Sequence, residues 1–320
     1  MTPRVLTAGR SLPPITTTLI NDAGNLLRGQ FPRESKYTHR YLAWRYCTNP
    51  VSGPAFAEVR DGAGALIGFG AMSVTEWARA AEAPTRVGVV MDIAAHPVAR
   101  QGPIMMNAIV GAFPAAIEAG ITWGFGIPND NSLMSMGSMF GAVEHGTLPV
   151  TALRWAPPRR SSRSVDASRL TGREIGEWLA AVDQSAGRGW RSVWNEATLS
   201  WRLRSPHRSF ALHHDDHSAA ISTTLASRMG PVALIVKAWP RVGVQRPGLA
   251  RIAGKVAAFY RSPLVIHVGH NENVLVAGRQ VPSRFLPAPL HTLVLDLGAL
   301  GGNTDVFRPG TMELLDFDAV

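Results

Sequence analysis

Short apolar runs alternate with turn-forming residues along the chain and predict an alternation of strands and helices. Residues 56–68 contain two such runs on either side of an Arg-Asp-Gly-Ala-Gly turn, and this arrangement predicts a β-hairpin. Residues 87–95 are almost wholly apolar, which predicts a buried strand. Residues 104–118 carry Ala, Ile, Met and Val at helical spacing, so they predict a helix that Pro114 should kink.

The pattern of the first half recurs in the second half. Residues 42–45 read Leu-Ala-Trp-Arg and precede an Asn-Pro pair, and residues 199–202 read Leu-Ser-Trp-Arg and precede a Ser-Pro pair. A hairpin, a helix and a short apolar strand at residues 121–129 then follow in the first half. The matching segments of the second half are residues 210–221, 249–260 and 264–271. Because the order is the same in both halves, the sequence predicts a duplicated α/β domain.

A stretch rich in Pro, Ser and Arg at residues 156–164 separates the two halves and is typical of an exposed connector. We therefore expect four parts. They are an N-terminal extension at residues 1–36, a first domain at residues 37–155, a linker at residues 156–169 and a second domain at residues 170–320.

The composition narrows the class of protein. With 320 residues, of which 46% are hydrophobic, the chain can bury one large core or two ordinary ones. The net charge is +9, but the Arg residues are spread along the whole chain, so nucleic-acid binding is not expected and an anionic ligand is favoured. The single cysteine, Cys47, excludes an intramolecular disulfide and a cysteine-based zinc site. No membrane-spanning run and no secretory signal are visible, and a cytoplasmic location is the expectation.

The most informative segment joins the predicted strand at residues 87–95 to the predicted helix. The loop between them reads His-Pro-Val-Ala-Arg-Gln-Gly-Pro, and Arg100 lies where the helix should open. The first N–H groups of a helix have no partner within it, and the helix dipole adds partial positive charge there. A phosphate group therefore binds readily at such a place, and Arg100 would add a bidentate donor.

This order of strand, His-Pro-x-x-Arg loop with glycine, and helix resembles the cofactor-binding segment of the GNAT acyltransferases. Residues 41–46 with the following Asn-Pro, and residues 126–132 with the later Phe-Gly, resemble the start and end of GNAT-like domains in tandem bacterial members. The resemblance covers residues 37–154 and is weaker over residues 187–320. It implies two tandem α/β domains, each with a mostly antiparallel central sheet flanked by helices. The two-domain plan is also similar to that of the Fem-type aminoacyltransferases.

The resemblance implies that acetyl-CoA or another acyl-CoA binds to the first domain and that no metal is used. The residues that match the cofactor-binding positions are Ile93, Ala94, Ala95, Arg100, Gln101, Gly102, Ile104 and Asn129. One departure concerns Pro103 and Met105, which stand where the family has small residues, and proline lacks the N–H that would face a phosphate. The second domain lacks such a loop, so we expect it to shape the cleft for the acceptor.

For the chemistry, the resemblance implies direct acyl transfer to a small-molecule amine, such as an amino sugar, an amino acid or another metabolite. Asp92 is the candidate general base, because a carboxylate in an apolar strand is costly unless it is paired or used. The alternative is that Asp92 pairs with an arginine or caps a loop. The family often places a tyrosine after the next strand, but this segment has none, and Ser132 is the candidate that protonates the leaving thiolate through water. Asn129 and Asn131 could instead cap the following helix.

Other motifs favour structural roles. The run His-His-Asp-Asp-His at residues 213–217 contains metal-binding side chains, but its place in the repeat is a hairpin turn. Trp44 and Trp201 could form a substrate wall, although packing of a helix against the sheet explains them more simply. Two other functions stay open at this point. One is a ligand-binding protein without catalysis, and the other is Fem-type aminoacyl transfer from tRNA. A homodimer is compatible with the sequence.

Overall fold

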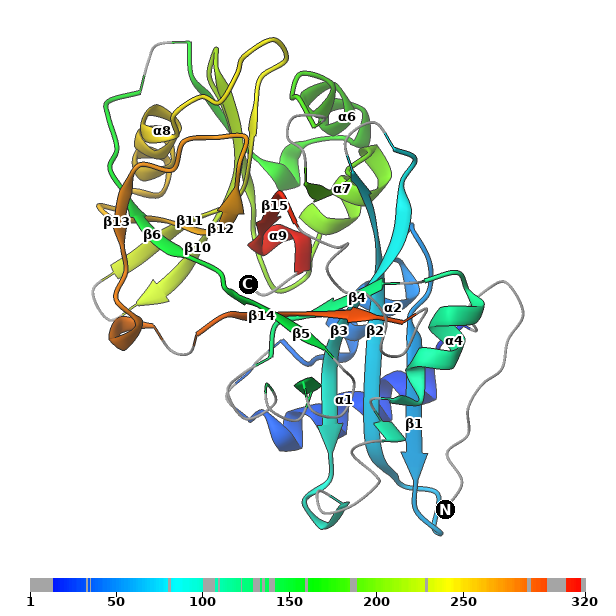
Figure 1. Ribbon diagram of the computed structural model, residues 1–320. Coiled ribbons are helices and arrows are strands. Elements are labelled where there is room, and N and C mark those ends of the chain that lie inside the picture. The colour runs from blue at the N-terminus through cyan, green and yellow to red at the C-terminus, as the bar shows by residue number, and fades with distance from the viewer. Residues whose placement is uncertain are drawn as a thin grey trace.

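The computed structural model describes most of the chain. The described residues are 14–32, 34, 36–79, 82–99, 107–108, 110–121, 123–128, 133, 136–137, 142–158, 161–184, 189–227, 230–286, 289–297 and 309–317. Two twisted sheets lie side by side with helices around them, and the termini of the described chain are on different halves (Figure 1).

The first sheet is built mainly from the first half of the chain. In spatial order its strands are β1 (Ala55–Arg60), β2 (Leu66–Arg79), β3 (Thr85–Ala95), β4 (Trp123–Gly126), β14 (His291–Asp296) and β5 (Val143–Thr147), and β8 (Trp190–Ser192) pairs with the end of β2. Neighbouring strands are antiparallel except for β3 and β4, which are parallel. The predicted hairpin and the predicted buried strand are therefore confirmed as β1, β2 and β3.

The second sheet repeats this plan. In spatial order its strands are β13 (Gly278–Gln280), β6 (Val150–Leu153), β12 (Val265–Asn271), β11 (Gly230–Pro240), β10 (Ser218–Ser227), β9 (Ala211–His214) and β7 (Arg163–Asp166), and β15 (Thr311–Glu313) pairs with β12. Here too a single neighbouring pair, β11 and β12, is parallel. Two mixed, mostly antiparallel sheets confirm the predicted fold class.

The two halves exchange strands: β6 of the first half lies in the second sheet, and β8 and β14 of the second half lie in the first sheet. The chain leaves the first sheet after β5, and the next strand, β6, joins the second sheet beside β12. In the second half the chain leaves after β13, and β14 joins the first sheet beside β4. The expected boundary between residues 155 and 170 therefore does not separate the two sheets. Within the expected linker, β7 forms an edge strand of the second sheet.

Helices cover both sheets. They are α1 (Thr17–Gln30), α2 (His39–Cys47), α4 (Ala112–Glu118), α6 (Gly172–Ala180), α7 (Glu196–Leu203), α8 (Ala250–Tyr260) and α9 (Leu314–Phe317), with short 3-10 turns at Pro97–Ala99, Ala167–Arg169 and Ser283–Phe285. In α1 the buried residues recur at helical spacing, so one side of the helix faces the protein interior. No described helix has the length and apolar character needed to span a lipid bilayer.

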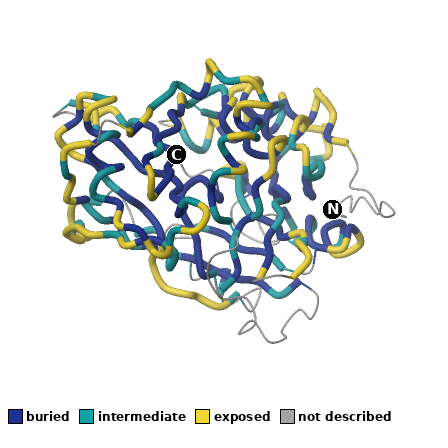
Figure 2. Tube along the Cα trace, turned by 90° about the horizontal axis from the view of Figure 1, so that it is seen from above, coloured by how far each residue is buried: buried dark blue, intermediate teal, exposed yellow. Residues whose placement is uncertain are grey.

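Each face of the first sheet has its own cover. Helices α1 and α2 pack against Phe69 and Ala71 on one face, although α1 falls within the expected N-terminal extension. Further along the same face, Trp77 lies in the core that the two sheets share. Helix α4 covers the opposite face, as α8 covers the outer face of the second sheet. Buried segments accordingly run through the middle of the molecule, with exposed loops around them (Figure 2).

The predicted helix at residues 104–118 is interrupted. Residues 107, 108 and 110 are helical, Gly111 forms a turn, and α4 begins at Ala112, while residues 104–106 lie outside the described part. Pro114 stands in the first turn of α4. Its ring would clash with the carbonyl group of residue 110, so the interruption precedes the proline by less than one turn.

The repeated Trp-Arg motifs meet where the two halves touch. Trp44 on α2 and Trp201 on α7 are 157 residues apart in the sequence, and their rings stack at 4.9 Å with an angle of 20°. The indole N–H of Trp44 donates to the carbonyl of Trp201 at 3.0 Å, and that of Trp201 donates to the carbonyl of Trp44 at 3.1 Å. The contact is reciprocal, because each Trp-Arg motif makes the same bond to the other.

Candidate functional site

The first sheet opens between its two parallel strands. Residues Val87 to Val90 of β3 pair with Trp123 to Gly126 of β4, and the pairing ends there. Strand β3 continues to Ala95, and among the described strands β2 alone pairs with this last part. Beyond Val90 the side of β3 that paired with β4 has no partner among the described strands, and we use the name β3–β4 cleft for this unpaired side of residues 91–95.

A β-bulge marks the start of this cleft. Phe69 of β2 pairs with Ala94 and Ala71 pairs with Met91, so Asp92 and Ile93 together stand opposite one residue. Asp92 has a φ angle of 52°, which is uncommon for a residue other than glycine. A bulge with such a residue turns main-chain groups out of the regular ladder, and bulges of this kind are frequent beside active sites.

The side chain of Asp92 points away from solvent. It is 4% exposed, whereas the residue as a whole is only half-buried. The accessible surface of Asp92 is therefore mainly its main chain. Met91 and Ile93 on either side are also half-buried. The bulge thus leaves part of its backbone accessible and keeps the carboxylate buried.

Side chains from the α1 and α2 layer hold the Asp92 carboxylate. The hydroxyl of Tyr46 donates a hydrogen bond to it, and the Nε atom of Arg45 lies 3.9 Å from it. Burial, and then the charge of Asp92, raise the pKa of Tyr46 well above its ordinary value. The same two causes raise the pKa of Tyr37, so both phenols stay protonated. The Asp92 carboxylate is thus paired with Arg45 and Tyr46, and its role in catalysis stays a prediction.

The other sequence-predicted residues fall into two sets. Ala94 and Ala95 are buried in β3, and Ala94 packs under α1 and α2. Arg100, Gln101, Gly102, Ile104, Asn129 and Ser132 lie outside the described residues. Their roles in cofactor binding and proton transfer stay predictions.

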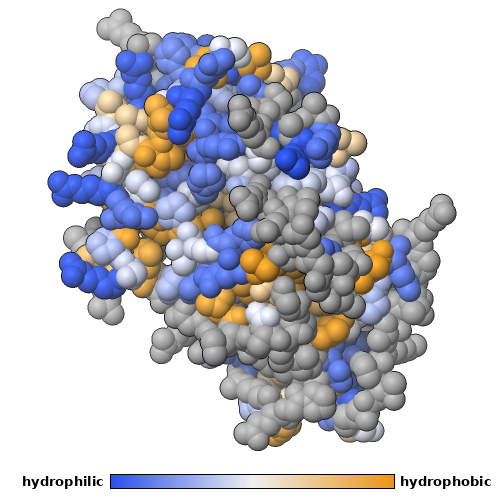
Figure 3. Space-filling model, in the orientation of Figure 1, coloured by the Kyte–Doolittle hydropathy of each residue, from blue (hydrophilic) through white to orange (hydrophobic). Residues whose placement is uncertain are grey.

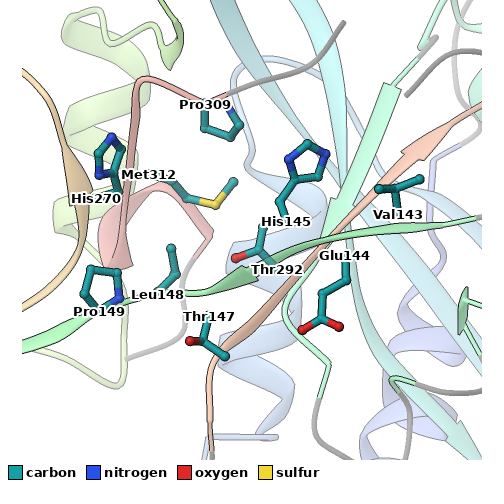
Figure 4. A pocket seen from close by; sticks show the side chains of 10 residues that line it. All are labelled: Val143, Glu144, His145, Thr147, Leu148, Pro149, His270, Thr292, Pro309 and Met312. Carbon is teal, nitrogen blue, oxygen red and sulfur yellow. The ribbon is translucent and has the colours of Figure 1, made fainter. Parts of the chain in front are cut away.

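A cavity lies beside the exchanged strand β14. It has a volume of about 570 Å³ and is lined by Val143, Glu144, His145, Thr147, Leu148, Pro149, His270, Thr292, Pro309 and Met312 (Figure 4). His145 and His270 stand on opposite sides of it in this view, and Met312 lies between them. Thr292 is two residues from Val294, which packs in the core between the sheets. The cavity therefore opens on the face of the first sheet that is turned toward the second sheet.

The histidine-rich run forms the expected hairpin. His213 in β9 is fully buried, and its ring nitrogens contact the hydroxyls of Ser164 at 2.7 Å and Ser222 at 2.6 Å. Burial lowers the pKa of His213 to about 3, so the ring is neutral. Asp215 accepts hydrogen bonds from the backbone of His217 and Ser218 and closes the turn. Among the described residues, no group of three His, Cys, Asp or Glu side chains is arranged to hold a metal ion.

Comparison with known proteins gives a similarity in structure alone. No family model and no curated protein matches the sequence. The chain is similar in structure to a probable N-acyltransferase from Enterococcus faecalis V583, with a TM-score of 0.60 and 10% identity over 94% of this chain and 74% of that one. A GCN5-related N-acetyltransferase from Anabaena variabilis ATCC 29413 has a TM-score of 0.60 and 12% identity over 90% and 72% of the two chains. The chain has a GNAT fold.

The tandem arrangement also has a counterpart. The N-myristoyltransferase of Saccharomyces cerevisiae, solved with bound myristoyl-CoA, is similar over 92% of this chain and 84% of that one, with a TM-score of 0.53 and 9% identity. The predicted resemblance to GNAT proteins is thus confirmed for the fold. In this GNAT fold the β3–β4 cleft lies beside β3, beyond the point where its pairing with β4 ends.

A polar cluster in the second half was not predicted. Lys237 of β11 is 2% exposed, and its Nζ atom lies 2.8 Å from the Asp316 carboxylate and 3.3 Å from that of Glu313. Burial alone would lower the pKa of Lys237, but the two carboxylates raise it above its ordinary value. The signal was present in the sequence, because Lys237 interrupts an apolar strand just as Asp92 does, and the same cost of burial applies to both.

Proposed function

We propose that this protein transfers an acyl group from acyl-CoA to a small-molecule amine and that the thioester binds in the β3–β4 cleft. The accessible main chain at the bulge, in a strand without a neighbour on the cleft side among the described strands, is the observation that carries this proposal. Backbone N–H groups held in a rigid sheet can stabilise charge on a carbonyl oxygen without moving. The similarity of fold to acyltransferases supports the same reading.

In the proposed reaction the nitrogen of the amine attacks the carbonyl carbon of the thioester. The C–N bond forms, the C–S bond breaks, the nitrogen loses one proton and the sulfur of CoA gains one. We propose that backbone N–H groups of the bulge donate hydrogen bonds to the carbonyl oxygen of the thioester. The N–H group of Ile93 is the first candidate donor. The sequence-based candidate that returns the proton to sulfur is Ser132, acting through water.

We assign to Asp92 the positioning of the bulge. Its carboxylate is buried, accepts a hydrogen bond from the hydroxyl of Tyr46 and lies beside the guanidinium of Arg45. A carboxylate with these neighbours is held in place by a hydrogen bond and an ion pair. A group at this place fixes the backbone that faces the thioester.

The 570 Å³ cavity is the proposed place for the amine acceptor. It lies between the two halves and offers hydroxyl, imidazole and carboxylate groups as hydrogen-bond partners. Glu144 is already bound to His291 at 2.8 Å. On the face in Figure 3, hydrophilic side chains predominate over the half that carries α6 and α8, with small hydrophobic patches among them. An amino sugar, an amino acid or a similar polar amine suits the threonine, histidine and glutamate side chains that line the cavity.

Calorimetric titration tests the proposed function without knowledge of the acceptor. We expect acetyl-CoA or a longer acyl-CoA to bind with one site per chain. The Arg100→Ala variant should bind about 1.5–3 kcal/mol more weakly, because it would lose a charge-assisted hydrogen bond to a phosphate. The Arg86→Ala variant removes an exposed arginine from the start of β3 and serves as the matched control with unchanged affinity. Absence of binding by acetyl-CoA, longer acyl-CoAs and CoA alike would contradict the proposal.

A further inference from the structure

The parallel strands of the second sheet stop pairing part-way along, as those of the first sheet do. Strands β3 and β11 each have 11 residues. Pairing with the next strand stops at Val90 in β3 and at Ile235 in β11, which is the sixth residue of each. Both strands are then bulged against their antiparallel neighbour. Counted in this way, Lys237 takes the place of Asp92 and Ala238 takes the place of Ile93.

The chain itself fills the second cleft. Strand β15 pairs with the end of β12, and α9 packs beside β11, so the C-terminal segment lies where β11 and β12 separate (Figure 1). Gly269 of β12 has a φ angle of 127°, and a Cβ atom there would lie 2.3 Å from the carbonyl oxygen of Met312. Glycine at this position therefore permits the close approach of β15.

The Glu313 carboxylate occupies this cleft with a full set of donors. Its Oε2 atom accepts from the Asn271 amide at 2.9 Å and from the backbone N–H of Ala238 at 3.4 Å, and it lies 3.3 Å from Lys237 Nζ. Its Oε1 atom lies 2.7 Å from His267 Nε2. Glu313 is fully buried, and although burial raises its pKa, Lys237 and His267 lower it below the ordinary value.

We propose that the space between β11 and β12 is a binding site for a carboxylate group that the chain occupies with its own Glu313. The backbone N–H of Ala238, the amide of Asn271 and the charge of Lys237 form the site. The carboxylate site itself does not rest on the proposed function, but its parallel with the thioester site proposed for the first half does. One consequence is that the second half holds an internal ligand in place of acyl-CoA.

Rescue by small carboxylates tests this site. The Glu313→Ala variant removes the carboxylate and leaves the donors, so formate or acetate should raise its melting temperature, and the rise should increase with the logarithm of ligand concentration. Sodium chloride at the same ionic strength is the control for salt. Glu313→Gln is the matched control variant, because its side chain fills the same space. In this variant and in the wild-type protein, formate should raise the melting temperature no more than chloride does.

Two results would overturn the proposal. One is an equal effect of formate, acetate and chloride on Glu313→Ala, and the other is an equal carboxylate effect on all three proteins. If Glu313→Ala is unfolded in chloride, formate should restore its near-ultraviolet circular dichroism, and a chain that stays unfolded in both salts would also contradict the site. The test uses no CoA compound, so its failure leaves the proposed acyl transfer untouched.

Discussion

Replacement of Lys237 by methionine is expected to destabilise the protein by about 3–5 kcal/mol at pH 7. Methionine has a similar length and fills the same space, but it carries no charge. The buried carboxylates of Glu313 and Asp316 would then face each other without their shared cation. Chemical denaturation followed by tryptophan fluorescence measures the free energy of unfolding. Lys36→Met is the control, because Lys36 forms a partly exposed ion pair with Glu34 that is worth at most about 1 kcal/mol.

The loss in Lys237→Met should depend on pH. Without the cation, burial and mutual repulsion raise the pKa of both carboxylates in the folded state, so the folded variant binds more protons than the unfolded chain. Its stability should therefore rise as the pH falls from 7 toward about 5. In the wild-type protein the raised pKa of Lys237 stabilises the fold below about pH 10 and this contribution is lost at higher pH. A pH-independent deficit in the variant would contradict the shared-cation arrangement.

Asp92 provides the second large effect, because its replacement acts on both stability and binding. Asp92→Leu removes one partner of a buried ion pair with Arg45, which typically costs about 3–5 kcal/mol, and it removes the acceptor for the Tyr46 hydroxyl. With the bulge no longer fixed, we expect acyl-CoA to bind at least about 10-fold more weakly, which corresponds to about 1.4 kcal/mol. Titration calorimetry measures this affinity.

Asp92→Asn separates positioning from catalysis. Its amide oxygen can still accept the Tyr46 hydroxyl, so we expect its affinity for acyl-CoA to stay close to that of the wild-type protein. A general base, in contrast, would leave binding unchanged in both variants and reduce only turnover, by roughly 100-fold or more. Wild-type affinity in Asp92→Leu would therefore exclude the positioning role.

The local pattern was sufficient to predict the main elements of both halves. The segment of β3 from Val87 to Met91 contains no polar side chain, and the turn that joins β1 and β2 contains Asp and Gly at the positions that a tight turn needs. The Trp-Arg repeat predicted the duplication, because the helices α2 and α7 place the same residues at the same turn.

The exchange of strands could not be predicted from the sequence. Strands β6 and β14 are short and mostly apolar, and such a strand can pair within either sheet equally well. Which sheet it joins depends on contacts with residues far away in the chain. The direction in which the connection after β5 leaves the first sheet has no local sequence signal.

The sequence indicated that Asp92 must be paired or used, but it did not identify the partners. Tyr46 is 46 residues away, and it reaches Asp92 because α2 packs across the face of β3. Lys237 and Asp316 are 79 residues apart and meet because β15 and α9 enter the second cleft. Such partners follow from the tertiary fold, and the spacing of residues along the chain contains no information about them.

Hydrogen exchange of the backbone amides, measured with and without acyl-CoA, tests most directly whether the β3–β4 cleft is the acyl-CoA site. We predict that acetyl-CoA or a longer acyl-CoA slows exchange in residues 91–95. The equivalent residues 236–240 of β11 should not change, because the chain's own Glu313 already fills that cleft. Unchanged exchange at residues 91–95 with saturating ligand, or protection at residues 236–240 instead, would contradict the proposed site.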